Sequence, residues 1–248
     1  MKPVMLITGA SRGIGAATAL MAARAGYAVA VNYLNNALAA DEVVRQIHAL
    51  GAKAIAVQAD VAKEEQVLAM FAIVDSQLGP LSALVNSAGV VDVASRVDAM
   101  SVARIRRMFD TNVIGSMVCA REAVLRMSTL HGGAGGAIVN LSSVAATLGS
   151  PGQYVDYAAS KGAIDTFTVG LAREVAAEGI RVNSVRPGVI DTEIHASGGQ
   201  PERAQQLSAV IPMRRPGTTE EVASAILWLL SSGATYTTGA LLDVGGGR

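Results

Sequence analysis

A tyrosine and a lysine four residues apart, Tyr157 and Lys161, are the side chains in this sequence with the clearest chemical meaning. On a helix this spacing places both side chains on one face. A phenol with its ordinary pKa of about 10 is a poor acid–base group at neutral pH, and a nearby ammonium group lowers that pKa. The pair therefore predicts general acid–base chemistry, although an ordinary amphipathic helix can show the same spacing. Tyr154 lacks such a partner, because Ala158 stands four residues after it.

Two serines, Ser142 and Ser143, follow the mostly apolar segment Ala137–Leu141, which we expect to form a buried strand. A hydroxyl group in a loop at a strand end can hold and polarise the carbonyl oxygen of a substrate. Position along the chain leaves both serines as candidates for this task. A serine, a tyrosine and a lysine together predict chemistry at a carbonyl or hydroxyl group.

A glycine-rich segment, Thr8-Gly9-Ala10-Ser11-Arg12-Gly13-Ile14-Gly15, follows the short apolar run Val4–Ile7 and opens a helical segment. Glycines allow the backbone to turn tightly and to approach a pyrophosphate without interference from a Cβ atom. The helix that follows offers free N–H groups and a positive dipole end to the anion. The segment predicts a dinucleotide phosphate site, and the alternative is a turn that only joins a strand to a helix.

The segment after the second predicted strand, Ala28–Val31, indicates which dinucleotide binds. Sites that prefer NAD usually place a carboxylate there, on the ribose 2′-hydroxyl group. This chain has Asn32 at that point, and no carboxylate occurs before Asp41. Arg12 can donate charge-assisted hydrogen bonds to a 2′-phosphate, although a solvated surface arginine is the alternative. We therefore predict NADP(H) in preference to NAD(H).

The elements that position these residues alternate regularly between strand and helix. This alternation predicts an α/β fold: a Rossmann-like, doubly wound parallel sheet in three α/β/α layers, with residues 1–248 as a single domain. Ligands bind to such sheets outside the carboxyl ends of the strands. The further strands are expected at Ala54–Val57, Leu81–Val85, Arg181–Val185 and Ala240–Val244, and the helices at Gly13–Ala25, Ala37–Leu50, Glu64–Leu78, around Ser101–Met127, up to Glu178, and at Thr219–Leu230.

Composition excludes several other classes of protein. Lys plus Arg and Asp plus Glu each number 20 among 248 residues, so the formal net charge is zero and a nucleic-acid partner is not expected. Cys119 is the only cysteine, which excludes an internal disulfide. His48, His131 and His195 lack metal-ligand spacing, so no metal is expected; His195 lies near the expected substrate loop, with a solvated residue as the alternative. No apolar run has membrane-spanning length, and we expect a cytoplasmic protein without membrane contact.

Taken in order, the pattern T-G-x-x-x-G-x-G, the segment Asn86-Ser87-Ala88-Gly89 and the motif Tyr157-x-x-x-Lys161 resemble the short-chain dehydrogenase/reductase family. The resemblance extends over nearly the whole chain and implies interconversion of a carbonyl and a secondary alcohol by hydride transfer from a nicotinamide cofactor. It implies Tyr157 as general acid, Lys161 as its cationic partner, Ser143 as holder of the carbonyl, and Asn112 as support for a proton relay. An asparagine that bends or caps a helix is the alternative for Asn112.

The resemblance also implies the residues that hold the cofactor: Asp60 and Val61 contact the adenine, and the segment Pro187–Thr192 holds the nicotinamide. The alternatives are a helix cap for Asp60 and a plain turn for Pro187-Gly188. Two features depart from the family pattern: Ser87 replaces a usual asparagine, and the segment from Ser143 to Tyr157 is one residue longer than the commonest spacing. The implied cofactor-binding residues are Gly9, Ser11, Arg12, Gly13, Ile14, Gly15, Asn32, Asp60, Val61, Asn86, Ala88, Gly89, Tyr157, Lys161, Pro187, Gly188, Ile190 and Thr192.

Substrate and assembly are less defined by the sequence. The motifs are most similar to the 3-oxoacyl-[acyl-carrier-protein] reductases and sugar dehydrogenases of the family, so a 3-oxoacyl thioester, a sugar or a small ketone is expected as substrate. The resemblance implies a homotetramer, or a homodimer, formed through helices around Ser101–Met127 and Tyr157–Glu178. The segment Glu193–Arg214 is expected to cover the site. A non-catalytic NADP(H)-binding regulatory protein is the alternative function.

Overall fold

The computed structural model describes residues 2–192, 198–200 and 202–248. Seven strands form one sheet in the order β3-β2-β1-β4-β5-β6-β7, and every neighbouring pair is parallel. The predicted Rossmann-like, doubly wound sheet is therefore confirmed. The strands are β1 (Val4–Ile7), β2 (Ala28–Tyr33), β3 (Ala54–Gln58), β4 (Leu81–Asn86), β5 (Gly136–Leu141), β6 (Ile180–Pro187) and β7 (Leu241–Val244).

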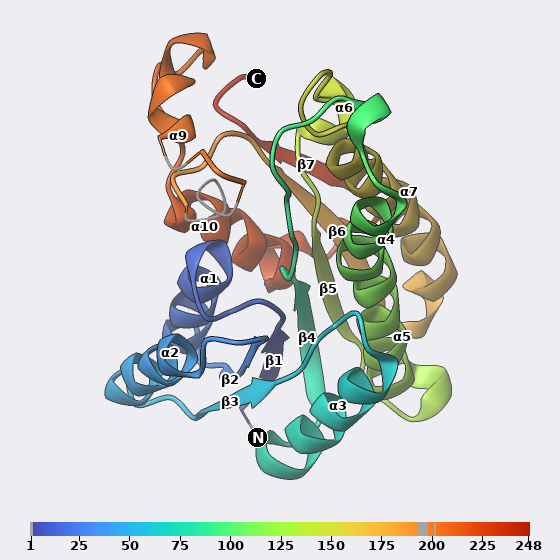
Figure 1. Ribbon diagram of the computed structural model, residues 1–248. Coiled ribbons are helices and arrows are strands. Elements are labelled where there is room, and N and C mark those ends of the chain that lie inside the picture. Colours follow the sequence, from blue (N-terminus) through green and yellow to red (C-terminus); the bar gives the residue numbers. More distant parts are fainter. Residues whose placement is uncertain (1, 193–197, 201) are drawn as a thin grey trace.

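Helices cover both faces of this sheet (Figure 1). On one face lie α1 (Gly13–Arg24), α2 (Ala37–Ala49) and α10 (Thr219–Leu230). On the other face lie α3 (Glu64–Leu78), α4 (Val102–Phe109), α5 (Ser116–Met127) and α7 (Val155–Val175), with the short helix α6 (Ala145–Leu148) before α7. A further short helix, α9, spans Arg203–Gln206.

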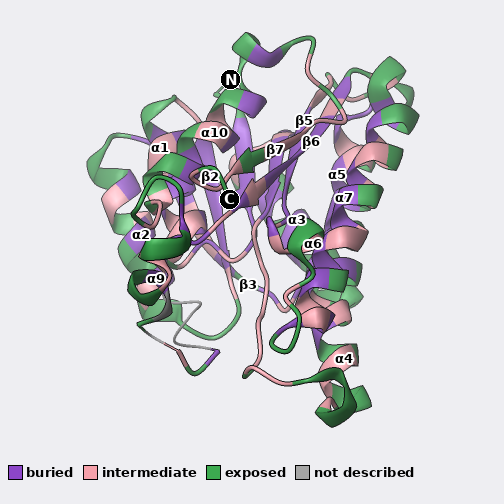
Figure 2. Ribbon diagram, turned by 90° about the horizontal axis from the view of Figure 1, so that it is seen from above, coloured by how far each residue is buried: buried purple, intermediate pink, exposed green. Residues whose placement is uncertain are grey.

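Two apolar cores, one on each face of the sheet, hold these layers together, as the buried interior in Figure 2 shows. Successive strand residues point to opposite faces, so Met5 and Ile7 of β1 enter the core under α1 and α10 while Val4 and Leu6 enter the other. A strand that is buried on both faces must be apolar at every position. This is why β1 reads as an unbroken apolar run. None of the described helices combines the length and apolar character required to span a membrane.

The strand order reverses between the adjacent strands β1 and β4. From β1 the sheet continues through β2 to β3 at one edge, and from β4 it continues through β5 and β6 to β7 at the other edge. Loops on either side of such a reversal diverge to opposite faces and leave a crevice at the carboxyl ends of the strands. The glycine-rich segment after β1 and the Asn86–Gly89 segment after β4 lie at this reversal. The fold therefore brings two of the predicted motifs together.

The region 101–127 differs from one uninterrupted α-helix. Between α4 and α5 the chain forms a π-helical turn, Asp110–Gly115, that contains Asn112. A Cβ atom on Gly115 would lie 2.8 Å from the backbone oxygen of Val61. The wider turn and the glycine therefore allow the helix to approach the loop after β3. Such turns recur at functional sites, and helical periodicity in the sequence does not reveal them.

Candidate active site

The glycine-rich segment makes a tight turn between β1 and α1. Gly9 and Gly13 adopt φ angles of 62° and 55°, a left-handed conformation that glycine adopts without strain. A Cβ atom on Gly15 would lie 2.5 Å from the backbone oxygen of Gly9. The first turn of α1 can pack directly on the loop only because that atom is absent.

Asn32, which the resemblance placed among the cofactor-binding residues, supports this loop from beneath. Its side chain is buried, accepts a hydrogen bond from the Gly9 N–H at 3.1 Å, and donates to the backbone oxygens of Val57 and Ala59 at 3.3 and 3.1 Å. Both ends of the amide are thus engaged within the protein. Asn32 therefore supports the phosphate loop, and its contact with the cofactor stays a prediction.

Thr8 has a related supporting function that the sequence analysis missed. Its hydroxyl oxygen accepts hydrogen bonds from the N–H groups of Ser87 and Ala88, both at 3.0 Å. A Cβ atom on Gly9 would lie 2.8 Å from the Cα atom of Ala88, so the two loops are in close contact. In the sequence, the position of Thr8 at the start of the glycine-rich pattern was the feature that could have indicated this supporting function.

The start of α1 fits an anionic ligand. The N-cap residue Arg12 makes no side-chain capping hydrogen bond, and the first turn carries no acidic residue. The first N–H groups of a helix have no partner within the helix, so they attract an anion unless a side chain caps them. Together with the glycine turn, this end of α1 has the shape and charge that a pyrophosphate group requires.

Asp60 and Val61 follow β3, beside the same crevice. Asp60 Oδ1 accepts a hydrogen bond from the Ala62 N–H at 3.0 Å, a local turn contact that leaves Oδ2 for another partner. Val61 is buried against Gly115. The N-cap residue of α3 is Lys63, so Asp60 does not cap that helix, and its contact with adenine stays a prediction.

Asn86 joins neighbouring elements at the end of β4. Its amide nitrogen donates to Asn140 Oδ1 at 2.9 Å and to the Ser116 backbone oxygen at 3.0 Å. Its Oδ1 atom is buried without a hydrogen-bond partner among the described residues. Asn86 and Thr8 thus brace the sheet on either side of Ser87, where the family pattern has a second asparagine.

The two neighbouring serines face different partners. Ser143 forms a side-chain hydrogen bond with Tyr157. Ser142 is buried, and its hydroxyl group donates to the backbone oxygen of Lys161 at 3.0 Å. The geometry therefore brings Ser143 to the tyrosine, despite the longer segment between them, and gives Ser142 a structural contact.

Tyr157 and Lys161 lie together on α7, with the Lys161 Nζ atom 5.6 Å from the centre of the tyrosine ring. Burial raises the pKa of Tyr157, and the hydrogen bond with Ser143 opposes that effect only in part. The expectation of a lowered tyrosine pKa is therefore wrong for this structure, because desolvation of the phenolate outweighs the favourable contacts. A phenol with a raised pKa stays protonated at neutral pH and is available as a proton donor.

Lys161 is also buried, and its Nζ atom donates to the Leu141 backbone oxygen at 2.7 Å. Burial lowers the pKa of Lys161 to about 8, while the charge of Asp165 acts in the opposite direction. Desolvation penalises an ammonium group, and a nearby carboxylate stabilises it. At neutral pH the lysine thus remains mostly cationic but lies close to its titration range.

Asn112 and Gly89 complete this cluster. The Asn112 side chain forms two hydrogen bonds with the Val90 backbone: it accepts one from the Val90 N–H at 2.8 Å and donates one to the Val90 oxygen at 3.0 Å. A Cβ atom on Gly89 would lie 3.4 Å from Asn112 Oδ1 and 3.6 Å from Lys161 Nζ. Gly89 therefore lies between the asparagine and the lysine and leaves the space between them open.

The segment after β6 closes the crevice from the other side. A Cβ atom on Gly13 would lie 3.8 Å from the Thr192 methyl group, so the loop after β6 reaches the glycine loop. A Cβ atom on Gly188 would lie 2.6 Å from the Cα atom of Gly245, and this glycine therefore lets the chain end pack beside it. His195, the candidate substrate contact, lies outside the described residues, as does most of the 193–201 segment.

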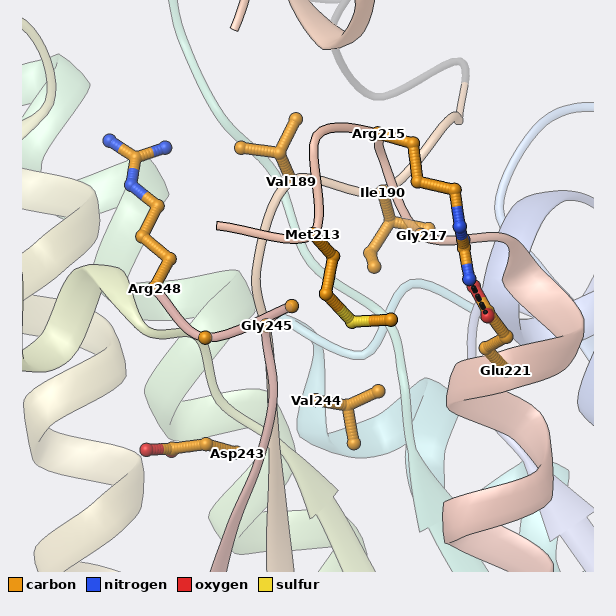
Figure 3. A pocket seen from close by; sticks show the side chains of 12 residues that line it. Val189, Ile190, Met213, Arg215, Gly217, Glu221, Asp243, Val244, Gly245 and Arg248 are labelled. Carbon is orange, nitrogen blue, oxygen red and sulfur yellow. Dashed lines mark hydrogen bonds and ion pairs between the residues drawn. The ribbon is translucent and has the colours of Figure 1, made fainter. Parts of the chain in front are cut away.

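A pocket of about 540 Å³ lies next to this segment, and Val189 and Ile190 form part of its wall (Figure 3). Its other lining residues come from the segment before α10, from the first turn of α10 and from the end of the chain. The figure shows Arg215 and Glu221 joined by an ion pair at the rim. Ser143, Tyr157 and Lys161 do not line this pocket, so it adjoins the predicted nicotinamide segment rather than the proton-transfer cluster.

Comparison with known proteins decides the family. A family model described as "Enoyl-(Acyl carrier protein) reductase" matches residues 9–248. This chain belongs to the short-chain dehydrogenase/reductase family.

Individual members of the family match over almost the full chain. The oxidoreductase YgfF of Escherichia coli K12 is 57% identical over 245 residues, which cover 99% of each chain. A 3-oxoacyl-[acyl-carrier-protein] reductase of Staphylococcus aureus is 39% identical over 242 residues, covering 98% of this chain and 96% of the relative. A blue fluorescent protein from a metagenomic library, solved in complex with NADPH, superposes with a TM-score of 0.90 at 34% identity, covering 99% and 97% of the two chains.

As a short-chain dehydrogenase/reductase, the protein is an oxidoreductase that acts on CH–OH groups and binds a nicotinamide cofactor. The open glycine cradle and the uncapped start of α1 fit the phosphates of that cofactor. Burial raises the pKa of the Cys119 thiol to about 12, so this thiol is not a reactive nucleophile. Within the described ranges, no three His, Cys, Asp or Glu side chains gather as a metal site, and the absence of a metal stays a prediction.

Proposed function

We propose that this enzyme reduces a ketone to a secondary alcohol with NADPH, and that Tyr157 supplies the proton. The observation that carries the proposal is the convergence of Ser143, Tyr157 and Lys161 beside Gly89 at the carboxyl edge of the sheet. This arrangement places a hydroxyl donor, a protonated phenol and a buried cation in one crevice. A regulatory protein would not require this set, which disfavours the non-catalytic alternative.

The proton steps follow from the contacts of these residues. In this proposal the bound nicotinamide supplies a hydride to the carbonyl carbon. The Ser143 hydroxyl group and the Tyr157 phenol donate hydrogen bonds to the carbonyl oxygen, where negative charge develops. Tyr157 then transfers its proton to that oxygen, and the Lys161 ammonium group stabilises the phenolate that remains. Asn112, which holds the Val90 backbone beside Lys161, supports the path by which the proton is replaced.

NADP(H) is the proposed cofactor, in preference to NAD(H). Arg12 stands at the N-cap of α1, and β2 is followed by Leu34, Asn35 and Asn36 without a carboxylate that would repel a 2′-phosphate. The NADPH complex of the similar blue fluorescent protein supports this preference. We also retain Pro187, Gly188, Ile190 and Thr192 as nicotinamide contacts, because their segment closes against the glycine loop.

A 3-oxoacyl thioester is the proposed substrate class, with a sugar or a small ketone as alternatives. The Staphylococcus aureus relative named a 3-oxoacyl-[acyl-carrier-protein] reductase supports this order. The test follows nicotinamide absorbance with purified protein, NADPH or NADH, and a panel of 3-oxoacyl thioesters, diketones, quinones and sugar lactones. Consumption of NADPH with one carbonyl class supports the proposal. If the protein binds NADPH but oxidises it with none of the compounds in the panel, the regulatory alternative is favoured.

Replacement of each neighbouring serine separates their functions. We expect Ser143→Ala to lower kcat by about 10²–10³-fold, because one donor to the developing oxyanion is lost. Ser142→Ala is the matched control. It removes a buried hydrogen bond to the Lys161 backbone, so we expect a loss of about 1 kcal/mol in unfolding free energy and a smaller change in kcat. Steady-state kinetics and thermal unfolding of both variants measure this difference, and equal kcat values would contradict the assignment.

We also propose a homotetramer, with a homodimer as the alternative. Apolar side chains are exposed along the helical region that the resemblance places at the subunit interface: Val102, Ile114, Met117 and Leu125. Several apolar side chains exposed along one helical region favour an interaction surface there. Analytical ultracentrifugation should therefore give about four times the mass of the 25.3 kDa chain, and a species of 25.3 kDa would reject the proposal.

A further inference from the structure

An ion pair between Asp165 and Arg186 lies one helical turn beyond Lys161. Arg186 donates to Asp165 Oδ2 from Nε at 3.0 Å, and its Nη2 atom lies 2.9 Å from the same oxygen. Asp165 is only 7% exposed, and its Oδ1 atom is buried without a hydrogen-bond partner among the described residues. An incompletely satisfied buried carboxylate is costly to the fold. This cost indicates a function other than stability.

The pair connects two parts of the proposed active site. Asp165 lies four residues after Lys161 on α7, so the two side chains occupy the same face of the helix. Arg186 is the residue before Pro187 on β6, where the predicted nicotinamide segment begins. The ion pair therefore joins the helix that carries Tyr157 and Lys161 to the strand end that carries the cofactor loop.

Asp165 is the carboxylate that acts on Lys161. Its charge opposes the decrease in the Lys161 pKa that burial causes. On α7 itself Tyr157 is the other titratable neighbour, while Asn112 of the π-helical turn and Gly89 of the β4 loop are uncharged. From β5, the Leu141 backbone oxygen accepts a hydrogen bond from the ammonium group.

Charged residues on the other surrounding elements are either paired with one another or exposed to solvent. On α4, Arg104 pairs with Asp156, with 2.7 Å between Arg104 Nε and Asp156 Oδ2. On α5, Glu122 pairs with Arg126. Asp110 of the π-helical turn is exposed to solvent.

Asp243 of β7 approaches the outer side of the pair. Its Oδ1 atom lies 3.6 Å from Arg186 Nη1, and its side chain is 57% exposed beside the pocket in Figure 3. Arg186 thus has one buried acidic partner next to Lys161 and one exposed acidic partner away from it. The chain therefore offers a matched pair of carboxylates for an experiment.

We propose that Asp165 and Arg186 form a positioning pair for the proposed reaction: Asp165 keeps Lys161 in its ammonium form, and Arg186 limits that effect while it fixes α7 against the β6 strand end. This inference rests on the proposed function. Without Asp165, burial alone would favour the neutral amine, and the Tyr157 phenolate would lose its stabilising cation. Without Arg186, no neighbouring cation would offset the negative charge of the Asp165 carboxylate, and this charge would raise the Lys161 pKa further.

The test measures the Lys161 pKa directly, with lysine labelled at the Cε carbon with ¹³C and followed by NMR through a pH titration. The chain has only four lysines, and Lys2, Lys53 and Lys63 are exposed internal references. We expect Asp165→Asn to lower the Lys161 pKa by about one unit, and Arg186→Gln to raise it. The alkaline limb of the pH profile of kcat/KM for ketone reduction should shift in the same directions.

Asp243→Asn is the matched control, and it should leave both the Lys161 pKa and the pH profile close to those of the wild type. Asp165→Glu keeps the charge and should preserve the position of the alkaline limb even if kcat falls. Thermal unfolding identifies variants that fail to fold; if Arg186→Gln is one of them, Asp165→Asn and Asp165→Glu still decide the question.

Two results would overturn the proposal: a folded Asp165→Asn variant whose Lys161 pKa is unchanged, or an equal shift in Asp243→Asn. The titration does not need a substrate, so failure of the two proposals can be told apart. If no carbonyl compound of the panel is reduced but the Lys161 pKa shifts in Asp165→Asn, the proposed reaction is refuted. The function of the ion pair in that reaction is then refuted with it. An active enzyme with an unshifted Lys161 pKa refutes the pair alone.

Discussion

Tyr157→Phe is expected to lower kcat for ketone reduction by at least about 10²–10⁴-fold, because it removes the proposed general acid. The ring stays in place, so the buried packing around α7 is preserved and NADPH should bind nearly as in the wild type. Steady-state kinetics measures the first effect, and a fluorescence titration with NADPH measures the second.

Tyr154→Phe is the matched control for this variant. Tyr154 is buried and lies three residues earlier, but it has no lysine at the corresponding position. We expect the control to keep most of its turnover. Substantial reduction activity in Tyr157→Phe, or an equal loss in Tyr154→Phe, would show that another group donates the proton.

Gly15→Ala is expected to weaken NADPH binding more than tenfold. The new methyl group would lie 2.5 Å from the Gly9 backbone oxygen and 2.9 Å from the Ala10 Cα atom. These are backbone atoms, so no side-chain rotation can relieve the clash and the phosphate loop must move. Overpacking of this kind also costs about 1–3 kcal/mol of unfolding free energy. Titration with NADPH and thermal unfolding measure the two effects.

Gly170→Ala provides the contrast. Gly170 lies within α7, where an added Cβ atom meets nothing within 4 Å. Alanine is the better helix former by up to about 1 kcal/mol, so we expect this variant to bind NADPH unchanged. Because α7 belongs to the proposed subunit interface, ultracentrifugation of the variant checks that its assembly is unchanged. If Gly15→Ala bound NADPH as tightly as Gly170→Ala does, the glycine loop would not be the phosphate site.

The local pattern of apolar and polar residues along the chain determined the architecture of this protein. Apolar runs such as Val4–Ile7 must be covered on both faces, and the helical segments between them supply that cover. The consequence is a parallel sheet with its loops at the carboxyl edge. Strand ends shifted by one or two residues, since β2 extends to Tyr33 and β6 to Pro187. Hydrogen bonds to neighbouring strands decide those ends, and hydropathy does not report them.

Site residues could be predicted where one local segment carries the whole signal. The glycine turn needs its φ angles within the turn itself, and the spacing of Tyr157 and Lys161 places them on one helical face. For these residues, local geometry and function coincide.

Contacts between distant segments determined what the sequence alone left open. Adjacent serines leave a strand in different directions, and the position of α7 against β5 brings Ser143 to Tyr157 and Ser142 to the Lys161 backbone. Folding also buried Asn32 beneath the phosphate loop and raised the pKa of Tyr157 rather than lowering it. The ion pair of Asp165 and Arg186 forms only when α7 packs on β6. Hydrogen-bond partners, burial and charge proximity are properties of the packed chain, because each depends on residues far apart in sequence.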